Sequence, residues 1–203
     1  MKLYTLTTGY LGVNSYILAN EETNEGILID SGEYYKKIKT FALEKNVNIK
    51  AVLYTHGHFD HMGNGKKFKD DGAKIYISKA DASKLCTDEN MGSYFHKKIE
   101  KFTADYEFID GETLNICGIN VKVLVTPGHT KGSACFVVED MIFSGDTLFF
   151  MDIGRTDFPD GNYTEMMNSL KRLLSLEGDY KVYPGHGEST TLKYEKENNP
   201  YRC

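Results

Sequence analysis

The sequence contains no tryptophan, only four prolines, and no apolar run long enough to cross a bilayer. A membrane-spanning helix needs about 20 consecutive, mostly apolar residues. The first ten residues include one lysine but lack the apolar stretch and small-residue cleavage site of a secretory signal. We therefore expect a cytoplasmic protein with no membrane partner.

A long run of basic residues is also missing. The 24 lysines and arginines are outnumbered by 29 acidic residues, which gives a formal net charge of −5. Basic pairs such as Lys66 and Lys67 are short and are typical of solvated helix faces. Because a surface that tracks nucleic-acid phosphates needs clustered positive charge, we expect no nucleic-acid partner.

The cysteines do not form a recognisable pair. Cys86, Cys117, Cys135 and Cys203 contain no C-x-x-C spacing, so the sequence indicates neither a zinc ribbon nor a redox dithiol. Cys117 and Cys135 lie in strand-like apolar runs. In a protein without an export signal, we expect them to be buried, reduced thiols.

The sequence is rich instead in short runs of β-branched and aromatic residues. These runs predict strands over residues 3–7, 14–19, 26–30, 51–55, 74–78, 107–109, 113–116, 121–126, 134–138, 141–144 and 181–183. Helical periodicity is clearest over 164–176 and 34–45 and weaker over 61–70, 79–85 and 192–198. Residues 87–103 fit either a helix or a mobile loop. Clustered strands with helices between them predict an α/β (α+β) fold.

The length of 203 residues suits one domain over residues 1–203. We expect two pseudo-halves within it, approximately residues 1–110 and 111–203. The sequence does not indicate the oligomeric state.

Residues 55–61, Thr-His-Gly-His-Phe-Asp-His, directly follow an apolar strand and hold three of the six histidines. Alternate side chains of an extended backbone point to the same side, so His56 and His58 can converge on one cation. A turn at Asp60 and His61 would direct a second pair of ligands slightly further on. This concentration of ligands predicts a metal site.

Three more candidate ligands follow other strands. His129 and His186 each occur in a Pro-Gly-His run, and Asp146 occurs in Ser-Gly-Asp-Thr. Glycine beside each ligand lets the backbone turn sharply and leaves room for a metal. Alone, Asp146 would be interpreted as a turn former, but beside the other ligands we interpret it as a bridging carboxylate.

Imidazole and carboxylate ligands suit zinc, iron or manganese. Zinc is our first expectation for the two divalent ions. Two cations about 3.5–4 Å apart can share a hydroxide and use it in hydrolysis.

Four runs contain these candidate ligands, at residues 55–61, 127–129, 144–147 and 184–186. In their order and spacing they resemble the metallo-β-lactamase superfamily over nearly the whole chain. The resemblance implies an αββα sandwich with the metals at one edge, between two β-sheets. It assigns the first metal to His56, His58 and His129, the second to Asp60, His61 and His186, and the bridge to Asp146.

Within the superfamily, the chain is most similar to a short single-domain bacterial branch of the glyoxalase II group. That group hydrolyses thiolesters such as S-lactoylglutathione, so the resemblance implies a small-molecule thiolester substrate. It also implies that Asp60 is catalytic, binding a metal and orienting the hydroxide. Residues 154–159 resemble the Gly-basic segment of the group, and Arg155 stands where a basic residue helps to hold glutathione. A structural salt bridge is the alternative role for Arg155.

Two other functions remain open. A persulfide dioxygenase shares the fold and a similar Gly-Arg-Thr-Asp-Phe run, and would hold one iron through His56, His129 and Asp146. A non-catalytic metal-binding module on the same scaffold would usually have lost ligands, whereas all seven candidates are present here. An exported β-lactamase is disfavoured because it normally carries cysteine where Asp146 stands.

Overall fold

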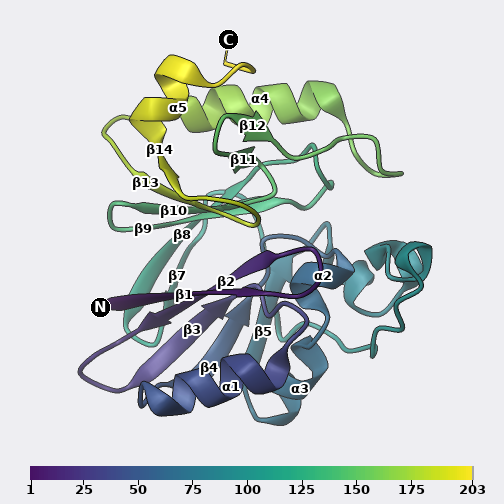
Figure 1. Cartoon of the computed structure of the whole chain (residues 1–203), viewed down its shortest axis with the longest axis vertical. Helices are drawn as coiled ribbons and strands as arrows, with labels where there is room; N and C mark the ends of the chain where they lie inside the picture. Colours follow the sequence, from purple (N-terminus) through teal and green to yellow (C-terminus); the bar gives the residue numbers. More distant parts are fainter. Residues whose placement is uncertain (203) are drawn as a thin grey trace.

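Two six-stranded sheets pack face to face in the computed structural model, which describes residues 1–202 (Figure 1). Cys203 lies outside the described residues. The first sheet runs in sequence order through β1 (Lys2–Thr8), β2 (Val13–Ala19), β3 (Glu25–Ile29), β4 (Asn48–Leu53), β5 (Lys74–Ser78) and β6 (Tyr106–Phe108). The second runs in space through β14 (Thr190–Thr191), β13 (Lys181–Pro184), β10 (Met141–Gly145), β9 (Ala134–Val138), β8 (Ile119–Val125) and β7 (Thr113–Ile116).

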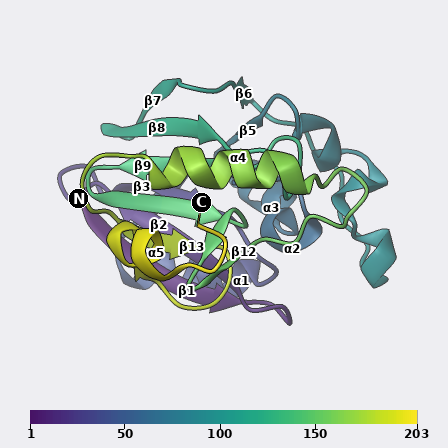
Figure 2. The same cartoon turned by 90° about the horizontal axis from the view of Figure 1, so that it is seen from above.

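Helices cover the outer face of each sheet, which gives four layers. The helices α1 (Tyr35–Glu44) and α3 (Gly65–Asp70) lie on the first sheet. The second sheet is covered by α4 (Tyr163–Leu174) and α5 (Leu192–Asn198), as Figure 2 shows from above. The predicted αββα sandwich is therefore confirmed.

The buried side chains form three apolar clusters that correspond to the contacts between the layers. One cluster fills the space between the two sheets, and each of the others lies between a sheet and its helices. The helix predicted over residues 164–176 is confirmed as α4, and its inward face buries Met166, Leu170 and Leu173 fully. Burying such a side chain contributes about 1.5–3 kcal/mol, so this face fixes the helix on its sheet.

The remaining elements lie at the edge where the two sheets diverge. They are α2 (Phe59–Met62), the 3-10 helices η1 (Ala82–Leu85), η2 (Asp88–Asn90) and η3 (Ser93–Phe95), and a small hairpin of β11 (Leu148–Phe149) and β12 (Asp152–Ile153). No helix within residues 1–202 is long and apolar enough to cross a bilayer.

The prediction of one helix over residues 61–70 was wrong. The chain forms α2 and α3 with a break at Gly63 and Asn64. Glycine has a low helix propensity, and the Asn64 side chain donates to the carbonyl oxygen of Gly32 at 3.1 Å, which holds the chain in a turn. Two short elements with a helix break between them can therefore be mistaken for one amphipathic helix.

The weak helix predicted over residues 79–85 is reduced to η1. Residues 87–103 form neither a regular helix nor a featureless loop. They contain η2 and η3, which end at Met91 and His96 with left-handed φ angles of 66° and 56°. The two-residue strands β11, β12 and β14 were not predicted, because so short a run carries no periodicity.

Candidate metal centre

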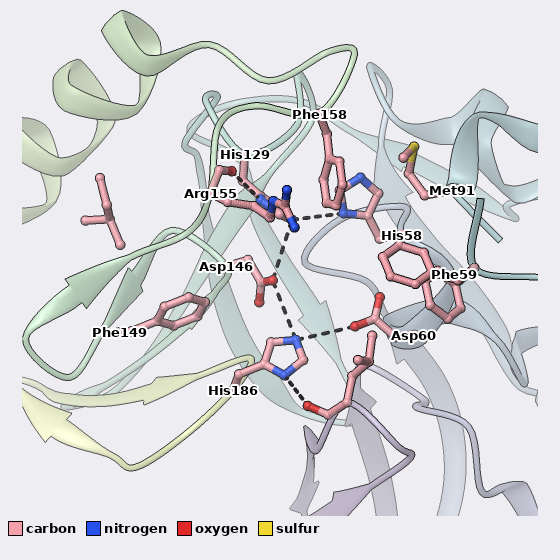
Figure 3. A pocket seen from close by; sticks show the side chains of 13 residues that line it. His58, Phe59, Asp60, Met91, His129, Asp146, Phe149, Arg155, Phe158 and His186 are labelled. Atoms are coloured by element: carbon pink, nitrogen blue, oxygen red, sulfur yellow. Dashed lines mark hydrogen bonds and ion pairs between the residues drawn. The ribbon is translucent and has the colours of Figure 1, made fainter. Parts of the chain in front are cut away.

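The seven predicted ligands lie together at one edge of the sandwich, between the two sheets. Figure 3 shows those that border the cavity: His58, Asp60, His129, Asp146 and His186. The first sheet supplies four of them, in the loop after β4 and in α2. The second sheet supplies His129 after β8, Asp146 after β10 and His186 after β13. Because β10 and β13 run parallel, their carboxyl ends reach the same edge.

The ligand atoms form overlapping groups, in each of which all atoms lie within 4.8 Å of one another. Two of these groups are named after the elements that contain or precede most of their residues, the β4 group and the α2 group. The β4 group is His56, His58 and His129, and the α2 group is Asp60, His61 and His186. A third combination of His56, His61 and Asp146 connects them.

In the α2 group, two imidazoles direct lone pairs at each other. The Nδ1 atom of His61 donates to Asp30 Oδ2 at 2.8 Å, and that of His186 donates to the carbonyl oxygen of Leu11 at 3.0 Å. A neutral imidazole has a single N–H, so both Nε2 atoms carry lone pairs. These two atoms lie only 3.3 Å apart. Such an approach is favourable only when positive charge is held there.

Carboxylates around the α2 group make positive charge at this position more favourable. Burial lowers the pKa of His61, but Asp146, Asp30 and Asp60 outweigh it and raise that pKa to about 10. Burial also lowers the pKa of His186, but Asp146 and Asp60 together outweigh it, so the net shift is upward. A divalent cation would satisfy the same electrostatic demand.

The β4 group shows a similar convergence of nitrogens. The Nδ1 atom of His129 donates to the carbonyl oxygen of Arg155 at 2.8 Å, which leaves Nε2 free and 2.9 Å from His58 Nδ1. Three buried atoms of the candidate ligands have no hydrogen-bond partner: His56 Nε2, His58 Nε2 and Asp146 Oδ1. An unsatisfied buried polar group costs about 1–3 kcal/mol, so these atoms call for a ligand.

Two imidazoles of the β4 group, those of His56 and His58, are held neutral. Burial lowers the pKa of His56, and the neighbouring imidazoles, His61 first, lower it further. Burial also lowers the pKa of His58, with His129 adding to the effect. Neutral imidazole is the form that binds metal. The seven residues therefore fit two divalent cations, and no cysteine within residues 1–202 belongs to any of the groups.

A fully buried carboxylate, Asp81, ties together the loops of the β4 group. Its Oδ2 accepts from the backbone N–H of Gly57 at 2.9 Å and from the Thr130 hydroxyl at 2.7 Å. Its Oδ1 accepts from the N–H of Gly132 at 2.9 Å. Gly57 lies between His56 and His58, and Thr130 follows His129. One side chain therefore fixes the backbone on both sides of the group.

Lys84 supports the same loop, because it pairs with Asp81 and packs against Gly57. Its Nζ lies 3.2 Å from Asp81 Oδ1 and 2.7 Å from Asp160 Oδ2, and the side chain is only 6% exposed. Burial lowers the pKa of Lys84, but Asp81 and Asp160 outweigh it, so the net shift is upward. The Lys84 stem also packs on Gly57, where an added Cβ would lie 2.6 Å from Lys84 Cβ. Glycine is therefore required between the two histidines.

The α2 group has its own buried carboxylate, Asp30, at the end of β3. Asp30 accepts from the N–H and hydroxyl of Thr55 at 2.9 and 2.7 Å, in addition to the His61 imidazole. Sequence reasoning missed both Asp30 and Asp81. Asp30 could have been found, because it ends an apolar strand before Ser-Gly, much as Asp146 follows a strand and Ser-Gly. Asp81 lies in Lys-Ala-Asp-Ala, which carries no such signal.

A cavity of about 430 Å³ opens onto the ligands. Apart from the ligands, the residues that line it are Leu11, Phe59, Met91, Phe95, Phe149, Ile153, Arg155 and Phe158. The structure places the predicted Arg155 on the cavity wall (Figure 3). Its guanidinium also donates twice to the Asp157 carboxylate, at 2.7 Å each, and lies 4.1 Å from the ring centroid of Phe158. The two roles considered for Arg155 thus coexist geometrically.

Comparison with known proteins agrees with this site. The family model of the metallo-beta-lactamase superfamily matches residues 8–186. A probable metallo-hydrolase of Streptococcus pyogenes is 36% identical, with 99% of this chain and 90% of that protein covered. The hydroxyacylglutathione hydrolase GloC of Haemophilus influenzae is 35% identical, with 93% of this chain and 92% of that protein covered.

Solved structures show the same arrangement over almost the entire chain. The BLEG-1 B3 metallo-beta-lactamase superposes with a TM-score of 0.94 at 29% identity, covering 98% of this chain and 99% of that one. ETHE1 from Myxococcus xanthus superposes with a TM-score of 0.85 at 27% identity, covering 98% and 84%. TTHA1623 in a di-iron-bound form gives 0.86 at 31% identity, covering 98% and 99%.

Proposed function

The chain belongs to the metallo-β-lactamase superfamily, and we propose that it is a dinuclear metal-dependent hydrolase of small-molecule thiolesters. The observation that carries the proposal is the buried ligand set, in which imidazole nitrogens from distant segments face each other at 2.9 and 3.3 Å. The similarity to a hydroxyacylglutathione hydrolase supports the thiolester as the bond cleaved.

We assign one cation to the β4 group, the second to the α2 group, and Asp146 to both. Zinc is the first choice, and iron or manganese would fit the same donors. Cations bound there would supply Lewis acidity toward a carbonyl oxygen and would lower the pKa of water to about 7.

Asp60 is the proposed catalytic carboxylate. Its Oδ2 lies 3.4 Å from His186 Nε2, and the side chain borders the cavity. Burial raises the pKa of Asp60, but the imidazoles of His61 and His186 outweigh it and hold the pKa well below its usual range. Asp60 therefore stays an acceptor, able to orient a nucleophilic water through one of its protons.

The walls of the cavity favour a leaving group that needs no proton. Outside the ligands, Arg155 is the only polar side chain among the described residues that line the cavity. A thiol with a pKa of about 8.5 can depart as a thiolate. An amide nitrogen is far more basic and requires a general acid, and apart from the metal ligands the described walls offer no histidine, cysteine or hydroxyl for that role.

Matched substrates test the proposal. Protein loaded separately with zinc, iron and manganese would be given a thiolester and the amide of the same acyl group. We expect the thiolester to be cleaved much faster, with two metal ions per chain at full rate. Comparable rates on the two substrates would contradict the proposal.

The similarity to ETHE1 suits the iron-dependent alternative equally well. Oxygen consumption on glutathione persulfide is therefore measured in parallel with thiolester hydrolysis. Persulfide-dependent oxygen uptake at one iron per chain, without thiolester cleavage, would assign the dioxygenase function instead.

A further inference from the structure

We propose that the preferred thiolester carries a bulky apolar substituent, which packs against an aromatic wall beside His58. This inference rests on the proposed thiolesterase function and concerns the selectivity of the same site. The wall consists of Phe59, Met91, Phe95 and Phe158.

Three separate segments build this aromatic wall. Phe59 comes from α2, Phe95 from η3, and Phe158 from the loop that follows β12. The rings of Phe59 and Phe95 lie 5.0 Å apart, and those of Phe95 and Phe158 lie 6.4 Å apart. Phe158 also contacts the His58 imidazole edge to face, at 5.4 Å. The wall therefore begins at the metal ligands and extends outward from them.

The wall leaves apolar area open to solvent. Phe59 is buried, whereas Met91, Phe95 and Phe158 are only half-buried although they line the cavity. Covering apolar surface is favourable by roughly 25 cal/mol per Å². A small hydroxylated acyl group would leave this area uncovered, while an alkyl chain or a phenyl ring would cover it.

Charge contributes little to recognition on the same side. Arg155 is the only lysine or arginine among the described residues of the cavity, and both oxygens of Asp157 already accept from its guanidinium. Asp157 already takes two of the five guanidinium N–H groups, so a substrate carboxylate would meet a cation whose charge is partly neutralised. With its charge paired, the flat guanidinium over Phe158 extends the wall as a stacking surface.

Two series of thiolesters test the inference and separate the two halves of the substrate. The first series varies the acyl group on glutathione through lactoyl, butyryl, hexanoyl and benzoyl. The second keeps the acetyl group and varies the thiol through glutathione, N-acetylcysteamine and benzyl mercaptan. In one of the two series, we expect kcat/KM to rise with the apolar size of the varied group. The expected rise is up to about fourfold for each methylene group that becomes buried.

The variant Phe95→Ser should remove most of this rise. Phe158→Ser is a second variant from a different segment, in case the first does not fold. Phe150→Ser is the matched control, because Phe150 is 45% exposed, stacks on Tyr194 and does not line the cavity. We expect the control to retain the full dependence on apolar size.

The outcomes separate the inference from the function on which it rests. If no thiolester is hydrolysed, the proposed function is wrong. If thiolesters are hydrolysed but kcat/KM is flat or falls with apolar size in both series, the aromatic wall does not select the substrate. The wall is equally excluded as the selective element if Phe95→Ser and Phe158→Ser behave like the Phe150→Ser control.

Discussion

The residues of the β4 group and those of the α2 group are held in place in different ways. The β4 group is the more deeply buried: its histidines are at most 3% exposed, although His58 and His129 border the cavity, and Asp81 fixes the backbone of both loops. The α2 group includes His186, which is 25% exposed and is oriented by the backbone carbonyl of Leu11 in the β1–β2 turn. One group is therefore buried and braced, whereas the other is more open toward the cavity.

Under the proposed function, the β4 group would mainly hold a metal, and the α2 group would also take part in the chemistry. A braced, buried group is suited to constant geometry, because buried backbone amides and a buried ion pair do not rearrange easily. An open group with an acceptor on the cavity wall is suited to contact with water and substrate. The comparison predicts that substitutions near the two groups will affect different measurable quantities.

The largest expected effect would come from Asp60→Asn. The amide keeps the size of the side chain but loses the negative charge that can orient a water, so kcat should fall by about 10²–10⁴-fold. Steady-state kinetics at a measured metal content would check this. Full activity at two metal ions per chain would show that Asp60 only holds metal, and the two groups would then not differ in this way.

The next effect should separate the two supporting carboxylates. Changing a residue that orients a metal ligand typically lowers metal affinity by about 10–100-fold. We expect Asp81→Asn to weaken metal binding at the β4 group and Asp30→Asn to weaken it at the α2 group. Each variant should therefore lose affinity for one of the two ions and retain it for the other.

Chelator competition with zinc, followed by the metal count per chain, would measure this separation. The two variants serve as controls for each other, because both replace a fully buried acceptor of several hydrogen bonds. Lys84→Met combined with Asp81→Asn removes the buried lysine, which would keep only Asp160 as its partner, as an alternative cause. Equal loss of both ions in each variant would mean that the groups are not supported independently.

A smaller effect is expected from Asn14→Ala. The Asn14 amide donates to the carbonyl oxygens of Pro184 and Gly187 at 3.1 and 2.9 Å, on both sides of His186. Losing these bonds should cost about 1–3 kcal/mol of stability and loosen only the α2 group. Thermal unfolding of the metal-free variant would measure the loss of stability, and unfolding of the zinc-loaded variant would show whether metal binding at the α2 group is weakened. A variant with normal affinity for both ions would show that the Leu11 contact alone orients His186.

The smallest expected effect is that of Arg155→Ala. Its backbone carbonyl orients His129, whereas its side chain only borders the cavity. We expect metal affinity to stay unchanged and KM for glutathione thiolesters to rise a few-fold, with little change in kcat, because contact with a remote group is largely uniform binding. A fall in kcat with unchanged KM would contradict this role.

The sequence indicated the seven residues that the structure brings together, but not the carboxylates that support them, for a physical reason. Metal ligands such as His56 and His129 lie in local runs whose spacing reflects the geometry of the strand ends. Asp81 acts through contacts with Gly57 and Gly132, which are distant in sequence, and no local pattern encodes such a contact.

The aromatic wall illustrates the same limit. Phe59 stands inside the metal-binding run, but Phe95 lies in a segment whose periodicity was ambiguous and reaches Phe59 only in the folded chain. Most strands and helices were predictable, because their periodicities are local, whereas their arrangement in layers was implied only by the resemblance to the superfamily. The cavity was not, since its walls come from segments that meet only at the end of folding.

The division of the ligands between two sheets also has a consequence for the order of folding. His61 and His186 are 125 positions apart in sequence, yet their Nε2 atoms lie 3.3 Å apart. Contacts of such long sequence separation form late, because loop-closure entropy opposes them until the sheets have docked. Tight metal binding must then follow the docking of the sheets, so the ions act mainly on the rate of unfolding and little on the rate of folding.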